Sequence, residues 1–179
     1  LPVGFRAAGI SSGIKENGAK DLGMVISDFP TASAATFTTN RIKAAPVRLS
    51  KRHLRHGDIR ALIVNSGNAN ACNGKQGFND AKLMTRFAAS SLELDPRQIF
   101  VCSTGIIGYP LPVETVQIAT PKIVKKLRVS GWRDFSQSIM TSDKVNKVSS
   151  FKTLIGLIHP FSQALSVIYF STDPIVTVP

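Results

Sequence analysis

The chain has 179 residues, with 43% hydrophobic and 18% charged residues and a formal net charge of +11. This composition is typical of a folded protein and excludes a disordered chain, and the length fits a single domain, residues 1–179. The N-terminal residues lack a secretory pattern, and no stretch approaches the ~18 consecutive apolar residues of a membrane span. With two cysteines, Cys72 and Cys102, and three scattered histidines, we expect neither disulfides nor a metal site, and reducing surroundings.

In chain order, two short patterns predict strands near the N-terminus. Residues 21–28 (DLGMVISD) are an apolar run bounded by turn signals, and residues 34–41 (AATFTTNR) show β-branched alternation. We therefore expect these two segments to form a first hairpin or sheet edge.

Basic residues gather between residues 41 and 60. At helical spacing, one face carries Arg48, Lys51, Arg52 and Arg55. A solvated helix face is the simpler interpretation. A nucleic-acid-binding module is the alternative and predicts affinity that falls steeply with salt, but the segment lacks interleaved aromatic residues for base stacking. We expect no nucleic-acid partner.

The rest of the chain alternates between strand and helix patterns. Residues 61–67 predict a strand buried on both faces, followed by a loop rich in Asn and Gly, and residues 79–92 predict a helix with Asn79 as its N-cap. Residues 98–108 predict a strand that runs into a glycine turn. Residues 111–127 predict one or two helices interrupted by Pro121, and residues 132–143 a further helix. This alternation indicates an α/β fold.

Only one turn suggests catalytic chemistry from its residues alone. Ser103, Thr104 and Gly105 follow an apolar strand, where the N–H groups of a tight turn can form an oxyanion hole. An ordinary turn is the alternative interpretation, because Ser-Thr-Gly sequences are common in turns. No Ser-His-Asp order, HExxH motif or P-loop accompanies it.

Six separated motifs together resemble one family. They are GFRAAGISSGIK, KDLGMVISD, FTTNRIKAAPV, IVNSGNANACNGKQG, STGIIG followed by PLP, and IMTSD, and they span residues 4–143. In this order and spacing they resemble the ornithine acetyltransferases, the glutamate N-acetyltransferases of arginine biosynthesis. The resemblance implies a layered sheet-and-helix α/β fold and acetyl transfer from N-acetylornithine to glutamate without a cofactor.

The resemblance also implies partners and site residues. A precursor of this family cleaves itself at an Ala-Thr bond into associated α and β chains, and the new N-terminal Thr is the nucleophile. Thr104 and Gly105 match the family's oxyanion pair. Thr141, which otherwise would be a helix-terminal cap, matches a substrate-binding threonine. We expect this chain to be the α-chain portion, with its own β chain as partner, acetyl-CoA as an alternative donor, and a location in the cytoplasm or an organelle matrix.

The expected nucleophile is missing from the sequence. Residues 156–160 (GLIHP) keep the family's shape, but Ala164 or Leu165 occupies the place of the threonine, depending on the side from which the segment is aligned. Ser162 and Ser166 are displaced by at least one residue, which along a strand turns a side chain to the opposite face. A degenerate, non-catalytic family member that acts as a binding or structural module is therefore the alternative function. Without a β half we expect this chain to be poorly soluble or oligomeric.

Overall fold

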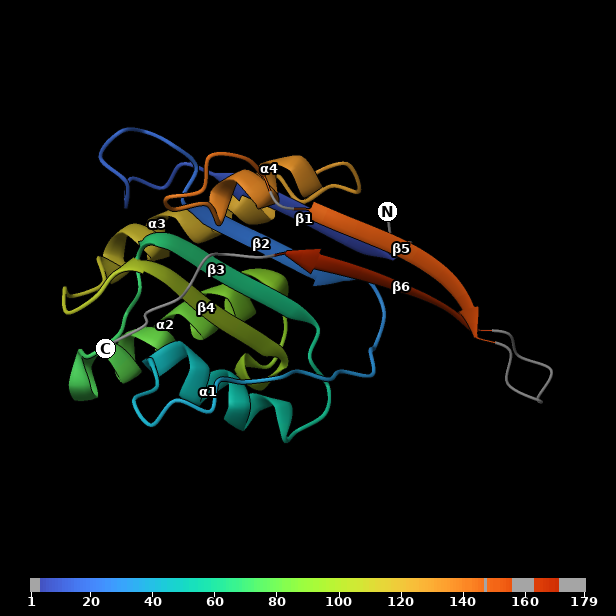
Figure 1. Cartoon of the computed structure of the whole chain (residues 1–179), viewed down its shortest axis with the longest axis horizontal. Coiled ribbons are helices and arrows are strands. Elements are labelled where there is room, and N and C mark those ends of the chain that lie inside the picture. Colours follow the sequence, from blue (N-terminus) through green and yellow to red (C-terminus); the bar gives the residue numbers. More distant parts are fainter. Residues whose placement is uncertain (1–3, 147, 156–162, 171–179) are drawn as a thin grey trace.

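The computed structural model describes residues 4–146, 148–155 and 163–170; for 149–155 and 163–170 it gives the main chain alone. A four-stranded sheet in the order β1-β2-β3-β4 forms its centre (Figure 1). Its strands are β1 (Phe5–Ile10), β2 (Leu22–Ser27), β3 (Ala61–Asn68) and β4 (Ile99–Ile106). β1, β2 and β3 pair antiparallel, and β3 and β4 pair parallel.

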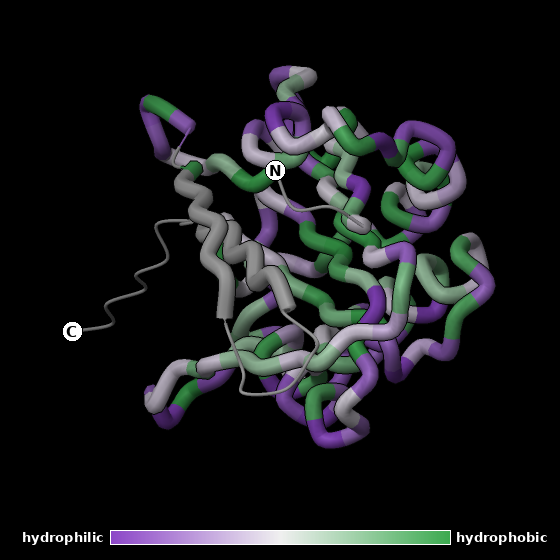
Figure 2. Tube along the Cα trace, turned by 90° about the vertical axis from the view of Figure 1, so that its right-hand side faces the viewer, coloured by the Kyte–Doolittle hydropathy of each residue, from purple (hydrophilic) through white to green (hydrophobic). Residues whose placement is uncertain are grey.

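Helices cover both faces of this sheet, which confirms the predicted layered α/β fold. One face carries α1 (Ala45–Leu54), α2 (Gly74–Leu92) and α3 (Val113–Val124). The opposite face carries α4 (Trp132–Ser138), whose Trp132 and Phe135 pack on Ala7 and Val64. A short 3-10 helix, Pro96–Gln98, leads into β4. In Figure 2 the hydrophobic residues run through the inner strands while hydrophilic residues gather at the periphery.

The side chains of the strands point alternately to the two faces of the sheet, and this alternation builds a hydrophobic core on each face. Ile63 on β3 and Val101 on β4 are fully buried and face α1, α2 and α3, whereas Val64 points to the α4 side. Successive side chains of a strand point to opposite faces, so a central strand covered on both faces is apolar on both. β3 is buried along nearly its whole length, as the sequence predicted.

The predicted strand at residues 34–41 is wrong, because this segment has no regular structure. β2 pairs instead with β1, which the sequence did not predict, on one side and with β3 on the other. Both edges of β2 are therefore occupied. β-branched residues favour a strand only where a sheet surface is available to pair with, and this segment lies largely exposed.

Three helix boundaries also differ from the prediction. α2 begins at Gly74, so its N-cap position is Asn73 and Asn79 lies exposed inside the helix. α3 continues through Pro121, which falls in its last turn and removes only one internal hydrogen bond. α4 ends at Ser138, five residues before the predicted end. The predicted basic helix is confirmed as α1, with its four named cations exposed.

A second sheet contains β5 (Val148–Ile155) and β6 (Gln163–Phe170), which pair antiparallel. Within the described residues, this hairpin forms no main-chain ladder with the four-stranded sheet. The family resemblance places the expected nucleophile in this hairpin, at Ala164 or Leu165 of β6.

Candidate functional site

Thr104 and Gly105 lie inside β4, at the carboxyl end of the parallel strands β3 and β4, and not in the tight turn that the sequence predicted. Thr104 pairs in register with Ser66, and Gly105 pairs with Gly67. Gly105 has a φ of +130°, and a Cβ built on it would lie 2.4 Å from the carbonyl carbon of Gly67. Only glycine fits this conformation and this close approach of two backbones. The backbone of the predicted oxyanion residues is thus fixed by pairing with the neighbouring strand.

Asparagine side chains form hydrogen bonds to the main chain next to this end of β4. Asn68 donates from Nδ2 to the carbonyls of Tyr109 and Pro110, at 3.2 and 3.0 Å, and Asn73 donates to the Tyr109 carbonyl at 2.7 Å. The fully buried Asn70 donates to the Gly77 carbonyl at 2.8 Å. The bonds from Asn68 and Asn73 tie the end of β3 and the loop after it to the loop after β4, and the bond from Asn70 ties that loop to α2. In the sequence these asparagines indicate a loop. In the structure the side chains of Asn68 and Asn73 satisfy main-chain groups 36–42 residues away, and that of Asn70 satisfies one 7 residues away.

Two buried polar atoms on β3 and β4, close to Thr104, have no hydrogen-bond partner among the described residues. They are Asn65 Oδ1 and Ser103 Oγ. Asn65 and Ser103 are register partners on β3 and β4, so their side chains lie side by side on one face of the sheet. Unsatisfied polar atoms in this position are unusual, because buried polar groups in folded proteins are nearly always hydrogen-bonded.

A buried carboxylate organises the loop of residues 11–20 next to this strand end. Asp21 is fully buried, and its oxygens accept hydrogen bonds from the N–H groups of Ser12, Gly13 and Lys15 and from the Ser12 hydroxyl, at 2.6–3.1 Å. The Asp21 carbonyl accepts from the Ser66 N–H at 2.8 Å. Asp21 therefore holds both the loop and β3.

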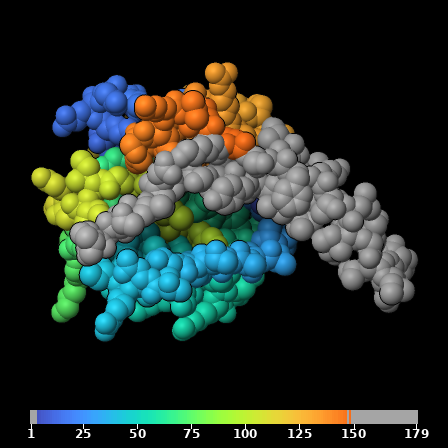
Figure 3. Space-filling view, in the orientation of Figure 1, coloured from blue at the N-terminus to red at the C-terminus, as the bar shows by residue number. Residues whose placement is uncertain are grey.

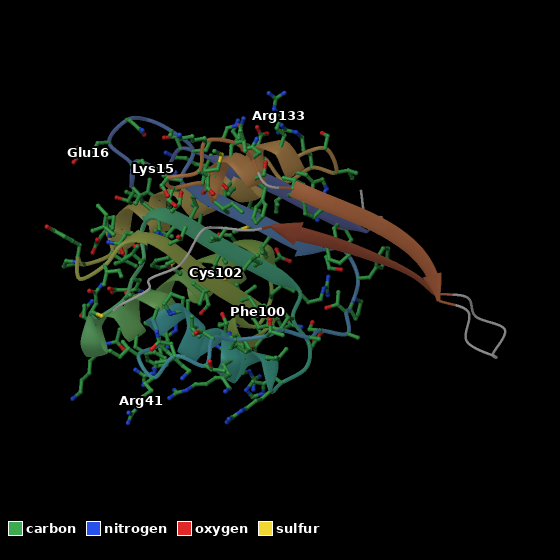
Figure 4. The ribbon with its side chains drawn as sticks, viewed as in Figure 1. Lys15, Glu16, Arg41, Phe100, Cys102 and Arg133 are labelled. Carbon is green, nitrogen blue, oxygen red and sulfur yellow. The ribbon has the colours of Figure 1, made fainter. Side chains whose placement is uncertain are left out.

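Lys15 joins the loop to the region of Thr141. Its Nζ donates to the carbonyl of Met140 at 2.6 Å and to that of Lys20 at 3.0 Å. Burial lowers the pKa of the Lys15 ammonium below its usual range, against the opposing effect of the Asp21 and Asp143 carboxylates. In Figure 4 Lys15 lies inward of Glu16, which points away from the body of the protein.

The side chain of Lys15 also reaches the glycine strand end. A Cβ built on Gly67 would lie 3.2 Å from Lys15 Cγ. The Lys15 side chain therefore lies beside the strand end opposite Gly105 and binds the main chain just before Thr141. Through Lys15 the structure brings the end of β4, with the predicted oxyanion residues, and the predicted substrate-binding threonine into one region.

A cavity of about 340 Å³ lies in this region, between the loop of residues 11–20 and the end of α4. Its volume is at the lower end of that of small-molecule sites. Thr141 itself lies on the surface and donates from its N–H to Asp143 Oδ2 at 3.2 Å. The cavity is lined by Lys15, Asn17, Ala19, Lys20, Gln137, Met140, Thr141 and Asp143.

Sequence reasoning gave no role to Lys15 or Asp21, although both lie in motifs that carry the family resemblance. A charged residue within an apolar or glycine-rich segment is a signal that could have identified them. Such a segment tends to be buried, and a buried charge requires hydrogen-bond partners.

The hairpin of β5 and β6 contains the place of the expected nucleophile. Ala164 pairs with Leu154, Leu165 with Thr153 and Ser166 with Lys152. Ser162 and residues 156–160 lie outside the described residues. Register therefore places Thr153 opposite Leu165, a neighbour that sequence spacing does not reveal.

The basic face of α1 is arranged around one ring of α2. Arg48, Arg52 and Lys82 lie 5.3, 4.8 and 5.1 Å from the centre of the Phe78 ring. Such cation–π contacts stabilise the packing of the two helices. Because cations surround this ring, it is a poor platform for stacking of bases.

Other classes of site have little support among the described residues. They contain no cluster of three or more His, Cys, Asp or Glu that suits a metal ion. No described helix is long and apolar enough for a membrane span. Cys72 and Cys102 are free thiols. In Figure 3 the segment that precedes α1, coloured blue to cyan, borders a hollow on this face of the molecule.

Comparison with known proteins shows one consistent similarity. The model of the ArgJ family matches residues 6–162. The chain is 37% identical over 187 residues to the arginine biosynthesis bifunctional protein ArgJ 1 of Clostridium acetobutylicum, covering 97% of this chain and 46% of the relative. It is 43% identical over 157 residues to the protein ArgJ of Symbiobacterium thermophilum, covering 87% of this chain and 39% of the relative. The chain thus spans less than half the length of these curated relatives.

Two solved structures match nearly the whole chain. A crystal structure of the arginine biosynthesis bifunctional protein argJ from Bacillus halodurans matches with a TM-score of 0.86 and 32% identity, over 97% of this chain and 89% of that one. The ornithine acetyltransferase of Mycobacterium tuberculosis, solved in complex with ornithine, matches with a TM-score of 0.83 and 34% identity, over 98% of this chain and 92% of that one.

Proposed function

The chain belongs to the ArgJ family, and from this premise we propose that it is the α-chain portion of an ornithine acetyltransferase of arginine biosynthesis. The observation that carries the proposal is the joining of separated motifs, through Lys15, at the carboxyl end of β3 and β4. The similarity to an ornithine acetyltransferase solved with ornithine supports the substrate class.

In the proposed reaction an enzyme hydroxyl attacks the acetyl carbonyl of N-acetylornithine. The oxygen of the tetrahedral intermediate is stabilised by the Thr104 hydroxyl and the Gly105 N–H, because donors fixed in advance lower the energy of developing negative charge. The carbon–nitrogen bond breaks, the released amine of ornithine takes a proton, and the acetyl group stays on the enzyme. The amine of glutamate then attacks the acetyl-enzyme, which regenerates the hydroxyl. Thr141 contacts the substrate, and the cycle needs no cofactor.

The proposal includes the partners expected from the sequence. These are the protein's own β chain, N-acetylornithine and glutamate, with acetyl-CoA as an alternative donor, in the cytoplasm or an organelle matrix. Two large apolar residues at and just after the end of β4, Ile106 and Tyr109, are exposed by 61% and 65%. Exposed apolar residues next to the candidate site support a partner chain that covers them. We propose no nucleic-acid partner, and the cations around Phe78 support this.

Direct tests are intact mass spectrometry and an acetyl-transfer assay on the protein expressed from its native locus. The proposal predicts two fragments, the second beginning at a threonine, and transfer of acetyl from N-acetylornithine to glutamate. Thr104→Val should lower kcat by about 10²–10³-fold, as for other oxyanion donors. Thr39→Val, at an exposed threonine of the segment before α1, is the matched control and should leave kcat unchanged.

The second candidate function is a non-catalytic family member, favoured by the absence of a threonine at Ala164 and Leu165. It predicts a single uncleaved species that ends at Pro179 and has no acetyl transfer. The coding DNA around Ala164 separates the two functions independently. A downstream frame that restores a threonine and a β half supports the enzyme, and a stop after Pro179 supports the non-catalytic protein.

A further inference from the structure

Lys15 differs from the exposed lysines because both its main chain and its ammonium group are held by hydrogen bonds. It lies 125 residues from Met140 in the sequence, and its ammonium contacts the Met140 carbonyl at 2.6 Å. Its main-chain N–H is held by Asp21 Oδ2 at 2.9 Å, so the start of the side chain is fixed by a buried carboxylate. A long, flexible side chain loses rotamer freedom when it is held in this way, and the contacts at both ends must offset that cost.

The contacts of Lys15 fall on two elements of the proposed site. Its Cγ fills the space beside Gly67 that a Cβ would need, and the register partner of Gly67 is Gly105. Its Nζ binds the carbonyl of the residue that precedes Thr141. Among the described residues, the main chain after α4 is held by the long hydrogen bond from the Met140 N–H to the Gln137 carbonyl, at 3.4 Å, and by that from the Thr141 N–H to the nearby Asp143.

We propose that Lys15 is a positioning residue that holds the Met140–Thr141 main chain against the strand end carrying Gly67 and Gly105. This inference rests on the proposed function in one respect, namely that Thr141 contacts the substrate. The Lys15 side chain acts through Thr141 and takes no part in bond making. A charge-assisted hydrogen bond to a main-chain carbonyl is suited to this role because it is stronger than a neutral one.

The first test measures local order and does not depend on activity. Lys15→Met keeps the length of the side chain but removes the ammonium. In the full chain, amide hydrogen exchange of residues 139–143 should accelerate by about tenfold or more, the effect of losing one hydrogen bond to a charged group. Lys15→Arg, which retains donors for both carbonyls, should restore most of the protection. Lys75→Met, at an exposed lysine at the start of α2, is the matched control and should change nothing.

The second test measures coupling to Thr141 in the acetyl-transfer assay. Lys15→Met should lower kcat/KM by about tenfold, mainly through KM, because a misplaced substrate contact weakens binding. In a double-mutant cycle, Lys15→Met combined with Thr141→Val should be no worse than the more damaging single change, because both remove the same contribution. Lys15→Arg should recover most of kcat/KM.

Two outcomes overturn the inference. One is unchanged exchange of residues 139–143 in Lys15→Met, and the other is full additivity of Lys15→Met and Thr141→Val. If Lys15→Met does not fold, the same comparisons are made with Lys15→Gln and Lys15→Arg. If the unmodified protein shows no acetyl transfer, the proposed function fails, and the exchange measurement still decides whether Lys15 holds this segment.

Discussion

Gly105 and Gly67 face each other across the parallel strands so closely that a Cβ on Gly105 would lie 2.7 Å from the Gly67 carbonyl oxygen. Gly105→Ala should therefore lower the free energy of unfolding by about 3 kcal/mol, the sum of backbone strain and overlap. Urea unfolding of the chain measures this change.

The matched control is Gly57→Ala, because Gly57 also has a positive φ, +76°, but a Cβ there meets nothing within 4 Å. It measures the strain of a left-handed backbone conformation without any overlap and should cost about 1 kcal/mol. Equal losses in the two variants would show that the contact with Gly67 contributes nothing.

Asp21→Asn should destabilise the loop of residues 11–20. The two carboxylate oxygens accept four hydrogen bonds, and an amide offers one acceptor oxygen, so the loss should be about 3 kcal/mol. Asp28→Asn breaks only the half-exposed ion pair with Arg6 and should cost less than about 1 kcal/mol. Urea unfolding compares the two variants, and limited proteolysis reports opening of the loop. Similar losses would argue against Asp21 as the anchor.

Two serines near β4 should respond to alanine in opposite ways. Ser103 Oγ is buried without a partner among the described residues, so Ser103→Ala should be neutral or stabilising by up to about 1 kcal/mol. Ser50 Oγ donates to the Val101 carbonyl and accepts from its N–H, at 2.8 and 3.0 Å, so Ser50→Ala should cost about 2 kcal/mol. Thermal unfolding of both variants decides this. A comparable cost for Ser103→Ala would reveal a bound water beside Asn65.

The contribution of Asp134 to stability should depend on pH. The hydrogen bond from Lys20, with a further contribution from Arg128, lowers the pKa of the Asp134 carboxyl below its usual range. The folded state thus binds a proton less readily than the unfolded chain. The stabilisation is complete above the ordinary pKa of about 4 and is lost as the pH falls through the lower folded value.

The measurement is the free energy of unfolding of the unmodified chain and of Asp134→Asn between pH 7 and pH 2. The difference should be about 1 kcal/mol at pH 7 and should disappear at the acid end. High salt should reduce it as well, since Lys20 and Arg128 are partly exposed. A difference that does not vary with pH would exclude ionisation as its source.

The sequence by itself determined the α/β class, the strands β3 and β4, the basic helix α1 and the family. These features depend on local periodicity, on glycine and asparagine turn signals and on ordered motifs, all of which can be read along the chain. The sequence also showed that no threonine stands at Ala164 or Leu165. Thr104 and Gly105 were candidates because the ordered motifs match the family's oxyanion pair, but the structure places them inside β4 and not in the predicted turn.

Only the tertiary structure decided which segments meet. Residues 34–41 have the composition of a strand, yet β1 takes the free edge of β2. The helix α2 begins at Gly74, five residues before the predicted start. Gly77 in its first turn has no side chain and so leaves room for Asn70. Lys15 reaches Met140 across 125 residues, and Asp21 becomes a buried anchor. Contacts of this kind arise from how sheet and helices pack, and sequence periodicity carries no information about which distant groups the packed core brings together.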